Sequence, residues 1–80
     1  MIYKSHVYVK TLNGRSHTVA VDDAMTVAEF FQATYRVVGT SEGRLIYAGR
    51  FLADQAKGKG DEYLTAALPH IWAEATIHAI

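Results

Sequence analysis

The sequence contains no cysteine, which excludes disulfide bonds, thiolate metal ligands and thiol-based catalysis. It has one proline, Pro69, and no apolar run near the roughly 18 residues that a membrane-spanning helix needs. Neither charge prevails, because eight lysines and arginines balance eight aspartates and glutamates. No net field therefore favours nucleic acid or an anionic membrane. Since the first residues also lack the apolar core of a secretion signal, we expect an intracellular protein, in the cytoplasm, the nucleus or both.

Length and composition predict a single domain over residues 1–80. The 80 residues are 50% hydrophobic and 20% charged, which is an ordinary balance for a folded protein. A chain of this length forms one core, and side chains fill it with little room left for a large cofactor. We expect no cofactor.

The N-terminal part has the pattern of a β-hairpin. Residues 6–10 and 18–22 alternate apolar and polar side chains on either side of an Asn-Gly pair. A three-residue loop with Gly14 in the left-handed conformation fixes the register and predicts that Val9 lies opposite His17. His17 then takes an inward position, as a tolerated polar residue near the sheet edge or, alternatively, as a partly buried pH-sensitive group.

The next segment predicts one amphipathic helix. Thr26 and Glu29 have the spacing of a capping box, and Gly39 is a suitable C-terminal stop. Apolar or small residues recur between them at helical spacing and form the predicted buried stripe. These are Val27, Phe30, Phe31, Thr34, Tyr35 and Val38.

The rest of the chain predicts a third strand, a short edge piece, one loop, a helical turn broken near Pro69 and a last strand. They fall at residues 44–48, 51–52, 53–62, 63–71 and 75–80. A helix packed on one face of a mixed four- to five-stranded sheet satisfies this order, with the first and last strands parallel and adjacent in the middle. The predicted architecture is an α+β fold of the β-grasp type.

Three stretches of the sequence resemble the ubiquitin-like family. HVYVKTLNGR at residues 6–15 resembles the opening hairpin of ubiquitin, and TIHAI at 76–80 its last strand. RLIYAGRFLAD at 44–54 resembles the third strand with its following turn and is the most specific of the three. The resemblance covers residues 5–54 and 75–80 and does not extend through 55–74.

The resemblance implies an exposed patch through which other proteins bind. We call this set the aliphatic patch; it consists of Leu12, Ile46, His78 and Ile80. The resemblance also adds neighbouring partner-binding residues, namely Tyr8, Lys10, Gly49 and Arg50. Alternation supports the patch independently, because strands that turn Leu45 and Ile77 inward turn Ile46 and His78 toward water. The alternative is a set of scattered surface apolar residues without a function.

The sequence departs from the family pattern at several points. Conjugated members end in a flexible tail with two glycines, whereas this sequence ends at Ile80, so as given we do not expect it to be conjugated. Arg50 takes the place of a chain-linkage lysine, and the predicted helix has no lysine. Within the longer segment 55–74, we favour Trp72 as a lid over the core and keep open a role as a partner anchor.

The residues do not indicate an enzyme or a metal protein. The acidic pairs at 22–23 and 61–62 read as loop residues, and no phosphate-binding glycine motif follows a strand. The histidines lack the spacing of a zinc site, so we expect no metal.

We therefore expect a non-covalent protein–protein interaction module in ubiquitin and proteasome signalling pathways. Its partners would be proteins with ubiquitin-binding or ubiquitin-like-binding motifs, with no small-molecule substrate, nucleic acid or membrane. The module would be a monomer or part of a larger protein. Two alternatives stay open: a conjugatable modifier whose tail is absent from this chain, and a β-grasp scaffold that binds an unrelated partner through residues 55–74.

Overall fold

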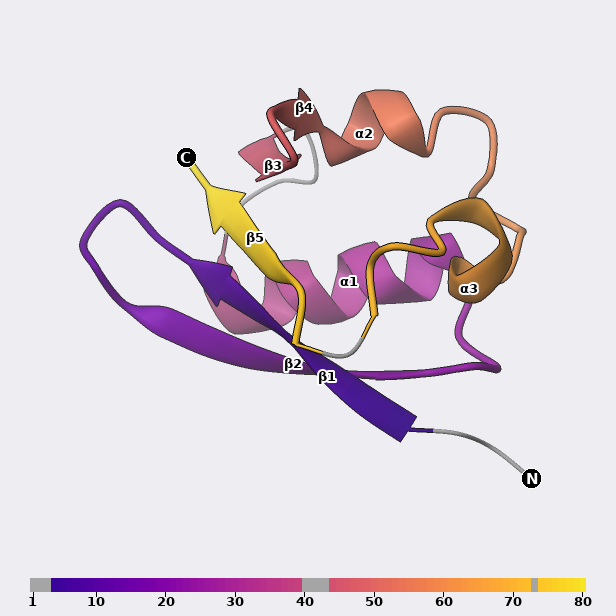
Figure 1. Cartoon of the computed structure of the whole chain (residues 1–80), viewed down its shortest axis with the longest axis horizontal. Helices are drawn as coiled ribbons and strands as arrows, with labels where there is room; N and C mark the ends of the chain where they lie inside the picture. Colours follow the sequence, from indigo (N-terminus) through magenta and orange to yellow (C-terminus); the bar gives the residue numbers. More distant parts are fainter. Residues whose placement is uncertain (1–3, 40–43, 73) are drawn as a thin grey trace.

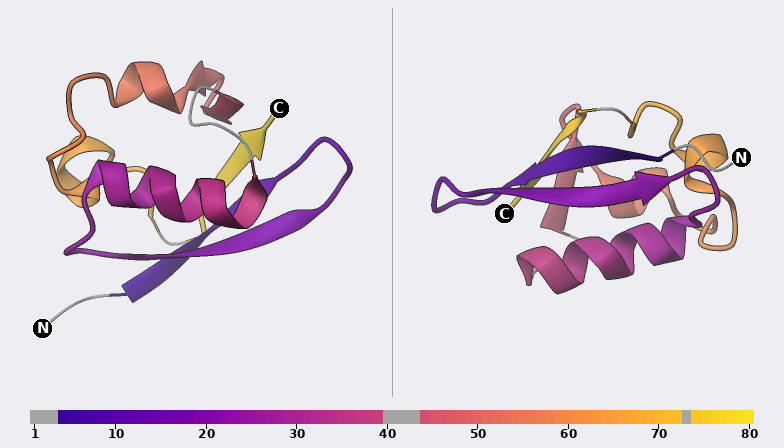
Figure 2. Two further views of the ribbon diagram at one scale, coloured as in Figure 1. Left: turned by 180° about the vertical axis from the view of Figure 1, so that it is seen from behind. Right: turned by 90° about the horizontal axis from the view of Figure 1, so that it is seen from below.

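In the part of the chain that the structure describes, five strands form one mixed sheet, and the helix α1 packs against one of its faces (Figure 1 and Figure 2). The computed structural model describes residues 4–39, 44–72 and 74–80. In chain order the elements are β1 (Lys4–Lys10), β2 (Ser16–Asp22), α1 (Val27–Val38), β3 (Leu45–Tyr47), β4 (Arg50–Phe51), α2 (Leu52–Gln55), α3 (Leu64–Ala67) and β5 (Thr76–Ala79). The fold therefore belongs to the α+β class.

The strands lie in the order β2-β1-β5-β3-β4. β5 runs parallel to β1, with Ile77 opposite Val9, and antiparallel to β3, with Ala79 opposite Leu45. The other two pairings, β1 with β2 and β3 with β4, are antiparallel. This arrangement confirms the predicted mixed sheet and the central, parallel position of the first and last strands.

The β1–β2 hairpin has the predicted register, with Val9 opposite His17. Gly14 has a φ of 82°, in the left-handed region, and the Thr11 amide donates to the Arg15 carbonyl at 2.9 Å. These features close the three-residue loop that the Asn-Gly pair predicts. His17 is half-buried, which agrees with its inward position on the edge strand β2.

The capping signals of α1 are also confirmed. The Thr26 Oγ1 accepts from the Glu29 amide at 3.2 Å, and the Glu29 Oε1 accepts from the Thr26 amide at 2.9 Å. At the other end, Gly39 adopts a φ of 78°, and its amide donates to the Tyr35 carbonyl at 2.7 Å. Since each end satisfies backbone groups that a helix leaves unpaired, the helix boundaries follow from local sequence.

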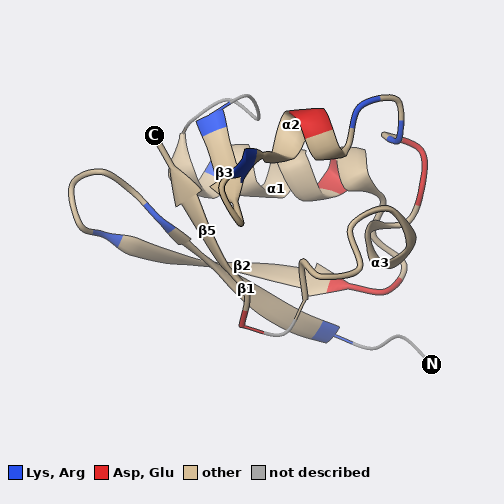
Figure 3. Cartoon of the chain, turned by 45° about the horizontal axis from the view of Figure 1, so that its top comes forward, with Lys and Arg blue, Asp and Glu red and all other residues tan. Residues whose placement is uncertain are grey.

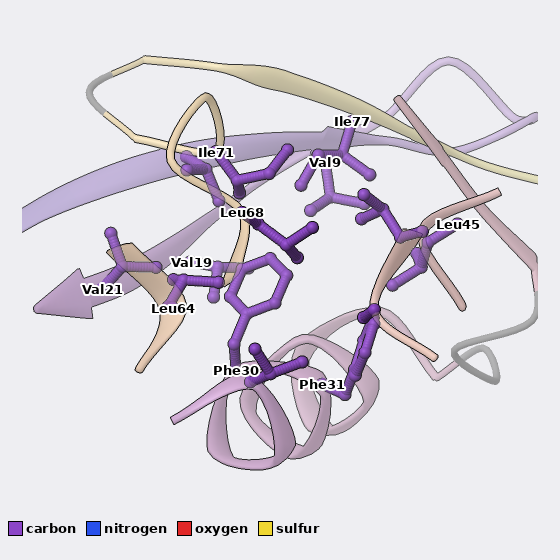
Figure 4. Packing of buried hydrophobic residues seen from close by; sticks show 14 of the residues in the cluster. Val9, Val19, Val21, Phe30, Phe31, Leu45, Leu64, Leu68, Ile71 and Ile77 are labelled. Atoms are coloured by element: carbon purple, nitrogen blue, oxygen red, sulfur yellow. The ribbon is translucent and has the colours of Figure 1, made fainter. Parts of the chain in front are cut away.

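Most of the core side chains come from the hairpin, α1 and the segment after β4, and they interdigitate between sheet and helix (Figure 4). The buried stripe of α1 consists of Val27, Phe30, Phe31 and Thr34. Tyr35, which the periodicity assigns to the same stripe, is instead 55% exposed. Its position lies about 80° around the helix axis from Val27, outside the arc that faces the sheet.

The prediction of a loop over 53–62 is wrong in its first part. Leu52, expected in an edge strand, is fully buried and begins the short helix α2, where the Ala56 amide donates to its carbonyl at 2.9 Å. In the stretch that follows, Ala56 is buried, Lys59 and Gly60 are half-buried, and Lys57, Gly58, Asp61 and Glu62 are exposed. The predicted helical turn before Pro69 is confirmed as α3. No helix in the described part of the chain has the length and apolarity to cross a membrane.

The loop between α2 and α3 caps the start of α1. The Val27 amide donates to the Glu62 carbonyl at 2.9 Å, and the Ala28 amide donates to the Gly60 carbonyl at 3.1 Å. These amides lie in the first helical turn, where no carbonyl of the same helix is available. The loop therefore satisfies donors that the capping box does not reach.

We expect Thr34→Val to raise the free energy of unfolding by about 1 kcal/mol, because a buried hydroxyl without a partner is costly. Thr34 is fully buried, and its Oγ1 has no hydrogen-bond partner among the residues that the structure describes. Urea unfolding measures the change. Thr18→Val, at an exposed position of β2, is the matched control and should change stability little. A destabilised Thr34→Val protein would contradict the assignment of an unsatisfied hydroxyl.

The capping box predicts a pH dependence of stability. Hydrogen bonds from the Thr26 backbone and then from its side chain lower the pKa of Glu29 below its ordinary value of 4.5. Since this pKa is lower in the folded state, the stabilisation is complete above the unfolded-state pKa and is lost as pH falls through the folded-state pKa. Glu29→Gln keeps a capping residue that does not titrate. We expect its unfolding free energy to fall less between about pH 5 and about pH 3 than that of the wild type; equal slopes in urea unfolding would contradict this.

Candidate functional site

The sheet has an outer face, turned away from α1, and one row of side chains crosses it over four strands. Leu45 and Ile77 are buried against the core, so their neighbours Ile46 and His78 project to the outer face. His78 pairs with Lys10 on one side and with Ile46 on the other. Ile46 in turn lies opposite Phe51 on β4. We call Lys10, His78, Ile46 and Phe51 the outer row.

The other two members of the aliphatic patch lie beside this row. Ile80 continues the outward alternation of β5, and its amide donates to the Arg44 carbonyl at 3.0 Å. Leu12, in the hairpin loop, lines the same shallow surface hollow as Ile80 and Arg44. Leu12 is 82% exposed and Ile80 43% exposed. This hollow is also lined by Val38 of α1 and by the buried Ala79, so Leu12 and Ile80 lie at the end of the sheet, whereas Ile46 and His78 form a cross-strand pair on the outer face.

Ile46 is less accessible than the alternation alone predicts. Strand alternation predicts that its side chain points to water, but the residue is half-buried. Its two cross-strand neighbours, His78 and Phe51, flank it and cover part of its surface. Ile46 therefore lies at the centre of the surface, between an exposed imidazole and an exposed phenyl ring.

Tyr8 and Lys10 lie on the same face, as expected. Lys10 is exposed, whereas Tyr8 is half-buried between its strand neighbours Thr18 and Thr76. The Tyr8 hydroxyl is 3.0 Å from His6 Nε2, and the two rings meet edge to face with centroids 5.2 Å apart. This contact fixes the Tyr8 side chain at the border of the aliphatic patch.

Gly49 and Arg50 lie outside the aliphatic patch. Gly49 occupies the turn between β3 and β4, where its φ is 77° and that of Ala48 is 55°. Arg50 pairs with Tyr47, so it belongs to the opposite side of the β3–β4 ladder from Ile46. It lines a hollow together with Tyr47 and residues of the segment after β4. Arg50 therefore borders the outer row without joining it.

Phe51 belongs to the outer row although the sequence analysis assigns it only to an edge strand. It is 42% exposed and pairs directly with Ile46. The signal that identifies it is the two-residue turn at 48–49. Because such a turn pairs Tyr47 with Arg50, the next pair must be Ile46 with Phe51.

A polar cluster fastens the segment after β4 to the β3–β4 turn. The Gln55 side-chain amide donates to the Tyr47 and Arg50 carbonyls at 3.3 Å and 3.4 Å. The Gln55 Oε1 lies 3.1 Å from His70 Nε2, and the His70 ring stacks on Tyr47 with centroids 5.3 Å apart. Since the Gln55 nitrogen already donates, its oxygen accepts and His70 Nε2 carries the proton. This contact holds the turn that carries β4.

The structure also bears on two other features of the sequence, the role of Trp72 and metal binding. Trp72 is half-buried and packs against the core, which favours its role as a lid. Within residues 4–39, 44–72 and 74–80, no three acidic or histidine side chains come together to hold a metal ion. Charged residues are distributed unevenly, with Lys and Arg on the β1–β2 hairpin and around β3 and β4 (Figure 3).

Comparison with known proteins gives no relative: no protein-family model matches the sequence, and no curated protein is significantly similar to it. The geometry of the outer face therefore carries the functional argument, together with the resemblance of the three sequence stretches.

We expect Trp72→Ala to lower the free energy of unfolding by about 2 kcal/mol, less than a fully buried tryptophan would cost, because the side chain is only half-buried. Chemical denaturation measures this change. If Trp72 is instead a partner anchor, stability will change little and partner binding will be lost.

Proposed function

We propose that this chain is a ubiquitin-like protein–protein interaction domain with a β-grasp fold. It is recognised non-covalently through the aliphatic patch, by proteins with ubiquitin-binding or ubiquitin-like-binding motifs. It acts inside the cell, in the cytoplasm or the nucleus, in pathways of the ubiquitin and proteasome type. Its role is binding, and catalysis is not part of the proposal.

The observation that carries the proposal is the pairing of Ile46 with His78 on the outer face, with Ile80 directly after β5 and Leu12 in the hairpin loop beside Ile80. These residues come from three separate parts of the chain: β5 pairs His78 with Ile46, and Leu12 lines a hollow together with Ile80. Single exposed apolar residues are common, but a continuous group on one solvated face is typical of an interface. The mixed sheet with one long helix and the parallel central strands agree with the fold that the resemblance implies.

The surface is small, which predicts weak binding. Four patch residues and their neighbours cover less area than a stable complex needs, so a single domain would bind transiently. Tight association would require several domains or several motifs acting together.

The proposal predicts that Ile46→Ala weakens binding at least about tenfold while lowering stability by only about 1 kcal/mol, because Ile46 is half-buried. We would titrate the isotope-labelled domain with a synthetic ubiquitin-binding-motif peptide up to about 1 mM and follow backbone amide shifts by NMR. The shifts should map to the aliphatic patch and its neighbours. Val37→Ala, at a 46% exposed valine of α1, is the matched control and should bind normally.

Two results would overturn the proposal. The first is no response of the wild-type domain at the highest peptide concentration. The second is a set of shifts confined to residues 55–74, which would favour a scaffold that binds through that segment.

A further inference from the structure

Phe51 is an aromatic side chain held at the surface by a fixed backbone. It lies on the edge strand β4, opposite Ile46, and remains 42% exposed. The next residue, Leu52, is fully buried and begins α2, so the chain cannot slide along β3. On the other side, the Gln55 side-chain amide donates to the Arg50 carbonyl at 3.4 Å. These anchors keep Phe51 beside Ile46 in the unbound protein.

The pair of Ile46 and Phe51 extends the apolar surface along the outer row, toward the edge strand β4. The outer row crosses four strands, and three strand spacings give it a length of about 14 Å. Phe51 forms the end of the row and Lys10 the other end. A partner side chain seated over Ile46 would therefore meet the Phe51 ring on one flank and the His78 imidazole on the other. Aromatic rings in such positions contribute strongly to binding.

Arg44 and Lys10, which flank the aliphatic patch, are basic, whereas the acidic Asp54 lines a hollow together with Arg50 and Phe51. Arg44 alternates outward beside Ile46, lies opposite Ile80 and is exposed, as is Lys10 at the end of the row. Among the described strand residues that alternate toward the outer face, the acidic one is Asp22, which pairs with Lys4 at the far end of the hairpin. Figure 3 likewise shows basic residues on the hairpin arms and around β3 and β4. A partner with carboxylates beside its apolar anchor complements this pattern.

We propose that Phe51 is a specificity-determining residue of this surface. It selects a protein segment that seats an apolar side chain over Ile46, against the Phe51 ring, and directs carboxylates toward Arg44 and Lys10. This inference rests on the proposed function, since it refines which partners the aliphatic patch accepts. Phe51 provides the apolar contact, and the positive charges of Arg44 and Lys10 favour a partner that carries negative charge.

The test compares variants for binding to one probe, a synthetic ubiquitin-binding-motif peptide with glutamates around its apolar anchor. We expect Phe51→Gln to weaken binding at least about fivefold and Phe51→Leu to weaken it less, because leucine keeps part of the apolar contact. Tyr35→Gln is the matched control, since Tyr35 is an aromatic residue on α1 with 55% exposure. NMR spectra and unfolding midpoints of each variant establish that it is folded.

A second arm replaces the glutamates of the peptide with glutamines. We expect the glutamine peptide to bind the wild type more weakly than the glutamate peptide does. For Arg44→Gln, the affinities of the two peptides should differ less, because this variant has already lost one of the two positive charges. Equal affinity for both peptides would overturn the charge part of the inference.

The outcomes separate this inference from the proposed function. If Ile46→Ala loses binding and Phe51→Gln binds like the wild type, the proposed function stands and the role of Phe51 is wrong. If the wild type does not bind the peptide, or Ile46→Ala has no effect, the proposed function fails and the inference fails with it. Loss of binding in both variants, with Tyr35→Gln unaffected, supports both.

Discussion

The parallel pairing of β5 with β1 is the interaction on which the rest of the structure depends. β5 has only four residues, Thr76–Ala79, yet it joins the hairpin to β3 and β4. Its inward residue Ile77 is fully buried opposite Val9, and the alternation of the strand then sends His78 outward between Lys10 and Ile46. Without this strand, the hairpin and the β3–β4 ladder would be separate sheets, and neither the core nor the outer row would be continuous.

Core and candidate surface are therefore two faces of the same strands. Every inward residue of β3 and β5 that packs in the core fixes the direction of an outward neighbour. Leu45 and Ile46 illustrate this coupling, since one is buried and the other lies opposite Phe51 and His78 on the neighbouring strands. A change in register that harmed the core would turn the aliphatic patch inward as well, so the surface is as well defined as the core.

The segment after β4 does more than connect elements. Its loop carbonyls accept from the first-turn amides of α1, while Leu52 and Leu64 fill the core. Its polar residues Gln55 and His70 contact the β3–β4 turn. The resemblance to the ubiquitin-like family does not extend through residues 55–74 of this segment, and the segment supports the helix at one end and the edge strand at the other. Its structural contacts account for much of its apolar content.

Local sequence by itself determined the β1–β2 register, the capping of α1 and the outward positions of His78 and Ile80, because turn geometry, caps and alternation act over a few residues. The exposure of Tyr35 follows from its angular position on α1, and the side on which Arg50 lies follows from the two-residue turn at 48–49. The helix α2 and the half-burial of Ile46 were decided by tertiary structure, because both depend on which distant segment packs nearby, and a sequence pattern carries no record of those neighbours. Phe51 lies between the two cases: a local turn sets its direction, but only its pairing with Ile46 makes it part of the surface.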